Sequence, residues 1–97
     1  MRYTLSQIAS LCGGKLCGED KLVRDIVTDS RSCLFGDGAM FVAMRGTNHD
    51  SHNFIGDMYN GGVRAFMVEA GADVAQREGA GYIYVENSLE ALQRLAE

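Results

Sequence analysis

The chain has 97 residues, of which 46% are hydrophobic and 23% charged, the composition of one small globular domain rather than of a disordered segment. Its formal net charge of -4 excludes general electrostatic binding to nucleic acid or to an anionic membrane, because such binding needs clustered Lys and Arg. A local basic site for one phosphorylated ligand stays open. No apolar run approaches the ~20 residues that span a bilayer, and no signal-peptide pattern opens the chain, so we expect a cytoplasmic domain.

The first predicted element is a helix that follows Thr4. Thr4 and Gln7 have the form of a capping box, in which each side chain binds the backbone N–H of the other residue. Apolar residues then recur at helical spacing, and Gly13-Gly14 ends the helix because glycine tolerates positive φ. A short strand is expected over residues 15–17, with a turn behind it.

Two strands are predicted in the middle of the chain. Val23, Ile26 and Val27 indicate a strand that runs into a polar segment at residues 28–31. After a turn at residues 36–38, the compact apolar run 40–44 is short enough to be a buried strand. The polar stretch that follows it, residues 46–50, is predicted to be a loop.

Helices and strands alternate in the second half. A helix is expected to begin near Ser51, with Phe54, Ile55 and Met58 on one face, and to end at Gly61-Gly62. The remaining segments are predicted as a buried strand over residues 64–69, a short helix over 72–78, a strand over 82–86 and a last helix. Asn87 or Ser88 caps that helix, whose Leu89, Leu92 and Leu95 recur every three residues.

This alternation predicts an α/β fold with a small mixed, partly parallel β-sheet flanked by helices. The last helix meets no glycine, asparagine or basic last turn before Glu97, which favours a fragment of a larger protein. We therefore expect residues 1–97 to form a single domain of a longer, multidomain chain.

The first polar segment is Thr28-Asp29-Ser30-Arg31. Ligands of open α/β sheets commonly bind beyond the carboxyl ends of strands, where this segment lies. Ser30 offers a hydroxyl and a backbone N–H, and Arg31 offers a planar charged guanidinium that suits phosphate or carboxylate. Residue types alone favour the alternative, a turn in which Asp29 accepts backbone N–H groups and Arg31 is a surface charge.

The second polar segment, residues 46–52, lies between a strand and a helix. Thr47, Asn48 and His49 supply neutral donors and acceptors, and the first turn of the following helix has free N–H groups that favour anionic oxygen. The alternative is an ordinary helix start, with Asp50 or Ser51 as N-cap and with His52 exposed or capping.

Several kinds of chemistry are excluded. The chain has no phosphate-binding G-x-x-x-x-G-K-[ST] loop, no G-x-G-x-x-G fingerprint, no nucleophile elbow and no pair of carboxylates placed for acid–base catalysis. Cys12, Cys17 and Cys33 lack metal-ligand spacing, and His49 and His52 lack the partners of a zinc set, so we expect free thiols and no metal site. The residues alone therefore predict an α/β domain with one polar ligand site and no catalytic residues.

Taken together, these segments resemble the N-terminal domain of the Mur ligase family. The matching pattern is D-[ST]-R, G-D, F-V-A-x-x-G, D-[GA]-H-x-F and a glycine-ended helix. It falls here on residues 28–31, 36–37, 40–46, 50–55 and 61–65. The opening residues 4–8 and 14–16, and weakly Ser51, are similar to the D-alanyl-D-alanine-adding member. The front half also resembles the ligase half of a ligase–alanine racemase fusion.

The resemblance implies that the domain binds the UDP end of a UDP-N-acetylmuramoyl-peptide. By position, Thr28 and Ser30 match residues that contact UDP in the family, and Thr47, Asn48 and His49 match a loop that lines the same site. Arg31 belongs to the same UDP-binding motif and, like Asp50 and His52, is also a candidate for bracing the two loops. No cofactor is expected in this domain.

The resemblance also implies where catalysis takes place in the full-length protein. ATP, Mg²⁺ and the catalytic residues belong to a central domain that lies outside these residues, and the partners of this domain are the central and C-terminal domains of the same chain. The full enzyme would activate the terminal carboxylate of the precursor as an acyl phosphate, which an amine then attacks. The alternatives are a diaminopimelate- or lysine-adding Mur ligase, and a free-standing α/β interaction or regulatory domain.

Overall fold

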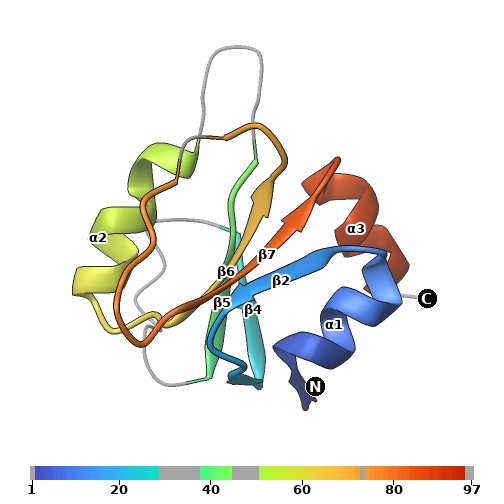
Figure 1. The fold of residues 1–97 in the computed structure, drawn as a ribbon, viewed down its shortest axis with the longest axis horizontal. Coiled ribbons are helices and arrows are strands. Elements are labelled where there is room, and N and C mark those ends of the chain that lie inside the picture. Colours follow the sequence, from blue (N-terminus) through green and yellow to red (C-terminus); the bar gives the residue numbers. More distant parts are fainter. Residues whose placement is uncertain (1, 29–37, 45–50, 73, 96–97) are drawn as a thin grey trace.

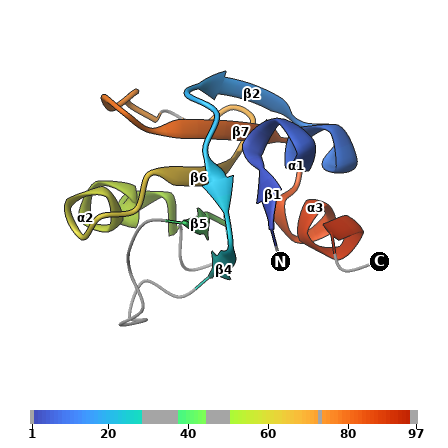
Figure 2. The same cartoon turned by 90° about the horizontal axis from the view of Figure 1, so that it is seen from below.

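A five-stranded sheet separates two helical layers in the computed structural model, which describes residues 2–28, 38–44, 51–72 and 74–95 (Figure 1). Helices α1 (Leu5–Cys12) and α3 (Ser88–Leu95) lie side by side on one face, and α2 (Ile55–Asn60) lies on the other (Figure 2). No helix in these ranges is long and apolar enough to cross a membrane.

The sheet is mixed and largely parallel. Its strand order is β2-β7-β6-β5-β4, in which β4 to β7 are parallel neighbours and β2 pairs antiparallel with β7. The predicted fold class is thereby confirmed. The strands are β2 (Lys15–Gly18), β4 (Asp25–Val27), β5 (Ala39–Val42), β6 (Ala65–Glu69) and β7 (Gly81–Val85).

The strand predicted from Val23 to Val27 is in fact two strands. β3 (Leu22–Val23) pairs antiparallel with β1 (Tyr3–Thr4) in a separate two-stranded sheet, and only β4 joins the main sheet. The break falls at Arg24, because the backbone N–H groups of Arg24 and Asp25 both donate to the carbonyl of Gly38, at 2.7 and 3.1 Å. The apolar pattern alone did not reveal this change of partner.

Burial on both faces explains the continuous apolar run of β5. Met40 and Val42 pack into the core beneath α1 and α3, whereas Ala39 and Phe41 pack into the core beneath α2. A strand covered on both faces has no solvent side and so loses the alternation of polar and apolar residues. The prediction of a buried strand here is confirmed.

The capping box of the first helix is confirmed, whereas Phe54, which precedes α2, makes no side-chain cap hydrogen bond. Thr4 Oγ1 accepts from the Gln7 N–H at 3.2 Å and Gln7 Oε1 accepts from the Thr4 N–H at 2.9 Å, while Gly13 ends α1 with a φ of 72°. The helix expected near Ser51 starts with a 3-10 turn, η1 (Ser51–Phe54), and continues as α2, which buries Ile55 and Met58. Gly61 follows its last residue.

The helix predicted over residues 72–78 is wrong. Residues 72 and 74–78 form no helix, and glycines with positive φ, Gly71 and Gly79, bound the segment. The buried hydroxyl of Tyr82 accepts from the Arg77 N–H at 3.0 Å and donates to the Ala75 carbonyl at 3.2 Å. These bonds to a tertiary partner replace the bonds that a helix would make within itself.

The last helix forms as predicted, but its buried face differs. Asn87 is the cap, since its Oδ1 accepts from the Glu90 N–H at 2.9 Å. Leu89 is 55% exposed, whereas Ser88 and Ala91 are buried. Residues three apart drift around a 3.6-residue helix, and small residues suit the close contact between α3 and α1. The expectation of no basic residue in the last turn of α3 is wrong, because Arg94 lies there, and residues 96–97 lie outside the described residues.

Candidate functional site

The strands that precede the two predicted binding segments end beside each other, at the carboxyl edge of the parallel sheet. Val27, the last residue of β4, pairs with Phe41 of the neighbouring parallel strand β5, so both strands end at the same edge of the sheet. Thr28 directly follows β4 and is exposed. Of the other candidates, Ser30, Arg31, Thr47, Asn48 and His49 all lie outside the described residues and stay predictions.

At this edge the ladder between β5 and β6 opens by one step. Val42 pairs with Met67, and the Ala43 N–H donates to the Met67 carbonyl at 2.9 Å. In a regular parallel ladder, the next bond would run from the Glu69 N–H to the Ala43 carbonyl. Side chains take both groups instead, because His52 Nε2 accepts from the Glu69 N–H at 3.0 Å and Ser88 Oγ donates to the Ala43 carbonyl at 2.7 Å.

A third bond closes this set of side chains. Glu69 Oε2 accepts from the Ser88 N–H at 3.0 Å, which places a carboxylate at the start of α3, where the helix dipole favours negative charge. Ser88 is fully buried, and its N–H and Oγ both have partners, as a buried polar residue requires. We refer to His52, Glu69 and Ser88 as the strand-end bracket.

The bracket differs from what the sequence suggested. His52, for which the residues suggested an exposed or capping role and the resemblance a bracing role, is half-buried and accepts a bond from the N–H of Glu69, 17 positions away. Glu69 and Ser88 were not candidates for the site. The available signal was the carboxylate of Glu69 at the end of the buried strand β6. Its partner Ser88 follows a different strand, β7, and no local sequence pattern indicates such a pairing.

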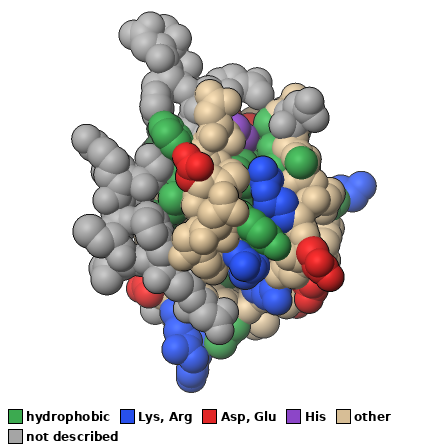
Figure 3. Space-filling model, turned by 90° about the vertical axis from the view of Figure 1, so that its left-hand side faces the viewer, with side chains coloured by type: hydrophobic (Ala, Val, Ile, Leu, Met, Phe, Trp, Pro, Cys, Tyr) green, Lys and Arg blue, Asp and Glu red, His purple; other side chains and the backbone are tan. Residues whose placement is uncertain are grey.

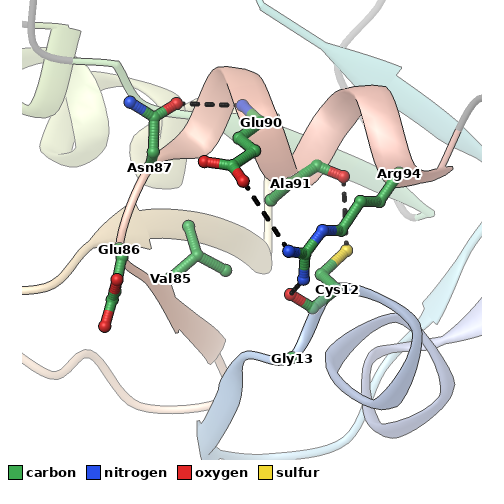
Figure 4. Close-up of a pocket in the computed structure, with 8 residues that line it drawn as sticks. All are labelled: Cys12, Gly13, Val85, Glu86, Asn87, Glu90, Ala91 and Arg94. Atoms are coloured by element: carbon green, nitrogen blue, oxygen red, sulfur yellow. Dashed lines mark hydrogen bonds and ion pairs between the residues drawn. The ribbon is translucent and has the colours of Figure 1, made fainter.

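A small hollow of about 140 Å³ lies next to this edge, between the end of α1 and the start of α3 (Figure 4). Arg94 crosses it, with Nη1 donating to the Cys12 carbonyl at 3.2 Å and Nη2 lying 3.6 Å from Glu90 Oε1 (Figure 4). Burial raises the pKa of the Cys12 thiol, and the charge of Arg94 only partly opposes this. The thiol is therefore protonated at neutral pH and a poor nucleophile.

The far end of α2 carries a cationic cluster. Figure 3 shows Lys and Arg side chains gathered on the side of the molecule where α2 lies. The Arg64 guanidinium carbon lies 3.9 Å from the centre of the Tyr59 ring, and that of Arg77 lies 5.9 Å from it. Arg64 Nη1 also donates to the carbonyls of Tyr59 and Val63, at 2.7 and 3.0 Å, and so closes the end of α2.

Metal chemistry finds no support in the part of the chain that the structure describes. No group of three His, Cys, Asp or Glu residues could hold a metal ion there. Cys12 and Cys17 are free thiols, as expected, and Cys33 lies outside the described residues. Within these ranges, the carboxyl edge combines exposed polar groups with side chains held by a hydrogen-bond network. It is therefore a better candidate for a ligand site than the α1–α3 hollow or the cationic cluster at α2.

Comparison with known proteins gives consistent results. No family model matches the chain. The chain is 32% identical over 93 residues to the UDP-N-acetylmuramoyl-tripeptide–D-alanyl-D-alanine ligase of Buchnera aphidicola, a match that covers 96% of the chain and 19% of the relative. It is 36% identical over 59 residues to the UDP-N-acetylmuramoyl-L-alanyl-D-glutamate–2,6-diaminopimelate ligase of Cytophaga hutchinsonii, covering 61% of the chain and 12% of that relative.

The solved structures agree on the fold. The D-alanyl-D-alanyl ligase structure from Acinetobacter baumannii superposes with a TM-score of 0.78 and 22% identity, covering 98% of the chain and 21% of that structure. At that identity the likeness shows the fold alone. The chain spans about a fifth of the length of the Buchnera relative and of this structure.

Proposed function

The chain belongs to the Mur ligase family, as an N-terminal domain, and from this premise we propose that it binds the UDP end of a UDP-N-acetylmuramoyl-peptide. The parent protein would be an ATP-dependent, amide-forming ligase of peptidoglycan precursor synthesis, at work in the cytoplasm. ATP and Mg²⁺ would bind outside this domain. Its own part would be to hold one end of the substrate.

One observation supports the location of this site. The two segments that resemble the UDP-contacting motifs of the family follow β4 and β5, which are adjacent parallel strands that end at the same edge. Thr28, which directly follows β4, therefore lies close to the end of β5, the strand that precedes the second segment in the sequence. A ligand as long as UDP could contact both segments at once.

The proposed role is one of positioning. The reacting carboxylate lies at the far end of the peptide, so contacts to UDP lower the entropic cost of placing that carboxylate in a neighbouring domain. Binding energy from a remote part of a substrate can be used in this way to raise the rate of the chemical step. The domain thus needs an accurate binding surface and no acid, base or nucleophile.

The identity of the added group is a narrower proposal. We favour D-alanyl-D-alanine, because the relative matched over 96% of the chain is a D-alanyl-D-alanine ligase, whereas the diaminopimelate ligase matches 61%. The relative rates at which the full-length protein uses the dipeptide and diaminopimelate test this choice. Faster use of diaminopimelate would contradict it.

A calorimetric titration of the chain with UDP tests the binding function. We expect saturable binding that Ser30→Ala and His49→Ala each weaken by about tenfold, the effect of losing one hydrogen bond to a charged group. Ser6→Ala is the matched control, because it removes a 2.8 Å bond to Asp20 near the start of α1, away from the carboxyl edge. Absence of binding at millimolar UDP would contradict the proposal and favour a free-standing interaction domain.

A further inference from the structure

Two arginines from separate segments meet at one aromatic ring of α2, the helix on the side of the molecule seen in Figure 3. The Arg64 guanidinium carbon lies 3.9 Å from the centre of the Tyr59 ring, and that of Arg77 lies 5.9 Å from it. Arg77 Nη2 also approaches Gly56, where a Cβ would lie 3.2 Å from it. The face of a tyrosine ring attracts cations, so the ring offsets part of the repulsion between the two positive charges.

Backbone carbonyls hold each guanidinium group by one of its nitrogens. Arg64 Nη1 donates to the Tyr59 carbonyl at 2.7 Å, and Arg77 Nη1 donates to the Ala75 carbonyl at 3.1 Å. The ring itself is fixed, because the Tyr59 hydroxyl donates to the Glu78 carbonyl at 2.6 Å. Among the described residues, Nε and Nη2 of both arginines have no acceptor. These two nitrogens form the planar edge that binds a carboxylate through two parallel hydrogen bonds.

Neither arginine has a carboxylate partner in the described part of the chain. No carboxylate oxygen there lies within 4 Å of the side-chain nitrogens of Arg64 or Arg77. Arg94, by contrast, lies 3.6 Å from Glu90. The sequence holds four more acidic than basic residues, so a shortage of carboxylates is not the reason. Both side chains are half-buried, which reduces the screening of their charge, and the cluster is therefore a local cationic site on an acidic chain.

We propose that Arg64, Arg77 and Tyr59 form a docking site for an acidic peptide, with an Asp or Glu carboxylate on each guanidinium edge. Charge complementarity identifies the partner as anionic. Tyrosine and arginine are also the side chains that most often dominate the binding energy of protein interfaces. The site is separate from the proposed UDP site, because Arg64 precedes β6 and so lies at the edge of the sheet opposite to the carboxyl ends of the parallel strands.

The position on α2 favours a carboxylate over a phosphate. Arg64 binds a carbonyl in the last turn of α2, the end at which the helix dipole is negative. That end disfavours a doubly charged phosphate more than a singly charged carboxylate. Phosphate sites commonly use the N–H groups of a helix N-terminus, which this end does not offer.

Titration of the isotope-labelled chain with an acetylated, amidated tetraglutamate peptide, followed by NMR, tests the proposal. We expect saturable binding that shifts the Nε–H signals of Arg64 and Arg77 and weakens as salt is added. Tetraglutamine, the uncharged control peptide, should shift neither signal. Arg77→Gln should weaken tetraglutamate binding by about fivefold, the upper end for an ion pair at a surface. Arg94→Gln is the matched control, because it removes the same charge from an arginine that already has a carboxylate partner, and it should leave the affinity unchanged.

A second variant separates the planar edge from charge alone. Arg64→Lys keeps the positive charge but cannot bind a carboxylate through two parallel bonds, so it should also weaken tetraglutamate binding by about fivefold. Thermal unfolding of both variants checks that they are folded at the temperature of the titration. Arg77→Gln does not depend on Arg64, whose bond to α2 contributes to the end of that helix.

Tetraglutamate binding by Arg77→Gln as tight as by the wild type would overturn the proposal, as would equal binding of tetraglutamine. Inorganic phosphate, titrated at the same ionic strength, tests the other anion. If phosphate shifts the Arg64 and Arg77 signals at lower concentration than tetraglutamate does, the cluster is a phosphate site and the acidic-peptide assignment is wrong. Failure in either way leaves the proposed UDP-binding function intact, because the two sites lie at opposite edges of the sheet.

Discussion

The contact between Gly81 and the chain after β2 makes Gly81→Ala a severe test of the fold. A Cβ at Gly81 would overlap the backbone carbonyl of Glu19 and the side chain of Leu5, which is fully buried. A backbone atom cannot move aside as the end of a flexible side chain can. The substitution must therefore displace the start of β7 from the end of β2, where Gly18 pairs with Gly81.

The cost can be estimated from what that displacement breaks. Overpacking costs ~1–3 kcal/mol. Loss of the 3.2 Å bond from the Glu19 N–H to the Ala80 carbonyl adds about 1 kcal/mol. The free energy of unfolding should thus fall by ~2–4 kcal/mol, and the melting temperature by roughly 10–25 °C for a domain of this size.

Urea denaturation followed by circular dichroism measures this loss, with Gly71→Ala as the matched control. Gly71 has a φ of 90° and open space within 4 Å of where an alanine Cβ would lie, so its substitution should cost only the ~1–2 kcal/mol of a left-handed conformation. A Gly81→Ala variant no less stable than Gly71→Ala would refute the packing of Gly81 against Glu19 and Leu5.

Three further predictions concern the helices and the hollow between α1 and α3. Gly56→Ala should raise the free energy of unfolding by about 0.5–1 kcal/mol in urea denaturation, because alanine favours α2 and the nearest atom to its Cβ is the movable Arg77 Nη2. A loss of stability would show that Arg77 cannot shift. Asn87→Ala should lower the melting temperature by removing the cap of α3, at ~1 kcal/mol, while Asn87→Ser should retain most of it. Folding raises the pKa of Cys12, so the folded state holds the thiol proton more tightly than the unfolded state. That contribution is complete below the ordinary thiol pKa of about 8.5 and is lost as pH rises through the raised value, so wild-type stability should decline more steeply above that pH than the stability of Cys12→Ala. Equal slopes would contradict burial of the thiol.

Local signals gave the elements that depend on neighbouring residues. The capping box at Thr4 depends on residues three apart, and the apolar run of β5 depends on burial along one strand. Both predictions are confirmed. The errors have a different origin. Residues 74–78 take their bonds from Tyr82, and the strand over Val23–Val27 divides because two N–H groups converge on Gly38. Tertiary partners of this kind leave no periodic trace in the sequence.

The same distinction applies to the candidate site. The carboxyl edge exists because β4 and β5 are parallel neighbours, and the alternation of helices and strands predicted a partly parallel sheet. Thr28 lies at this edge, directly after β4. The bracket could not be predicted, because it joins His52, Glu69 and Ser88 from three separate elements. The roles of Ser30, Arg31 and residues 47–49 stay predictions, since they lie outside the residues that the structure describes.

Mapping of UDP on the isotope-labelled chain by NMR tests the central claim most directly. The account predicts that saturating UDP shifts the amide signals of residues 28–31 and 47–49, with smaller changes at His52 and Glu69. The amides around the α1–α3 hollow at Arg94 and around the cationic cluster at Arg64 should stay unchanged. Shifts confined to either of those places, with none at the carboxyl edge, would contradict the account.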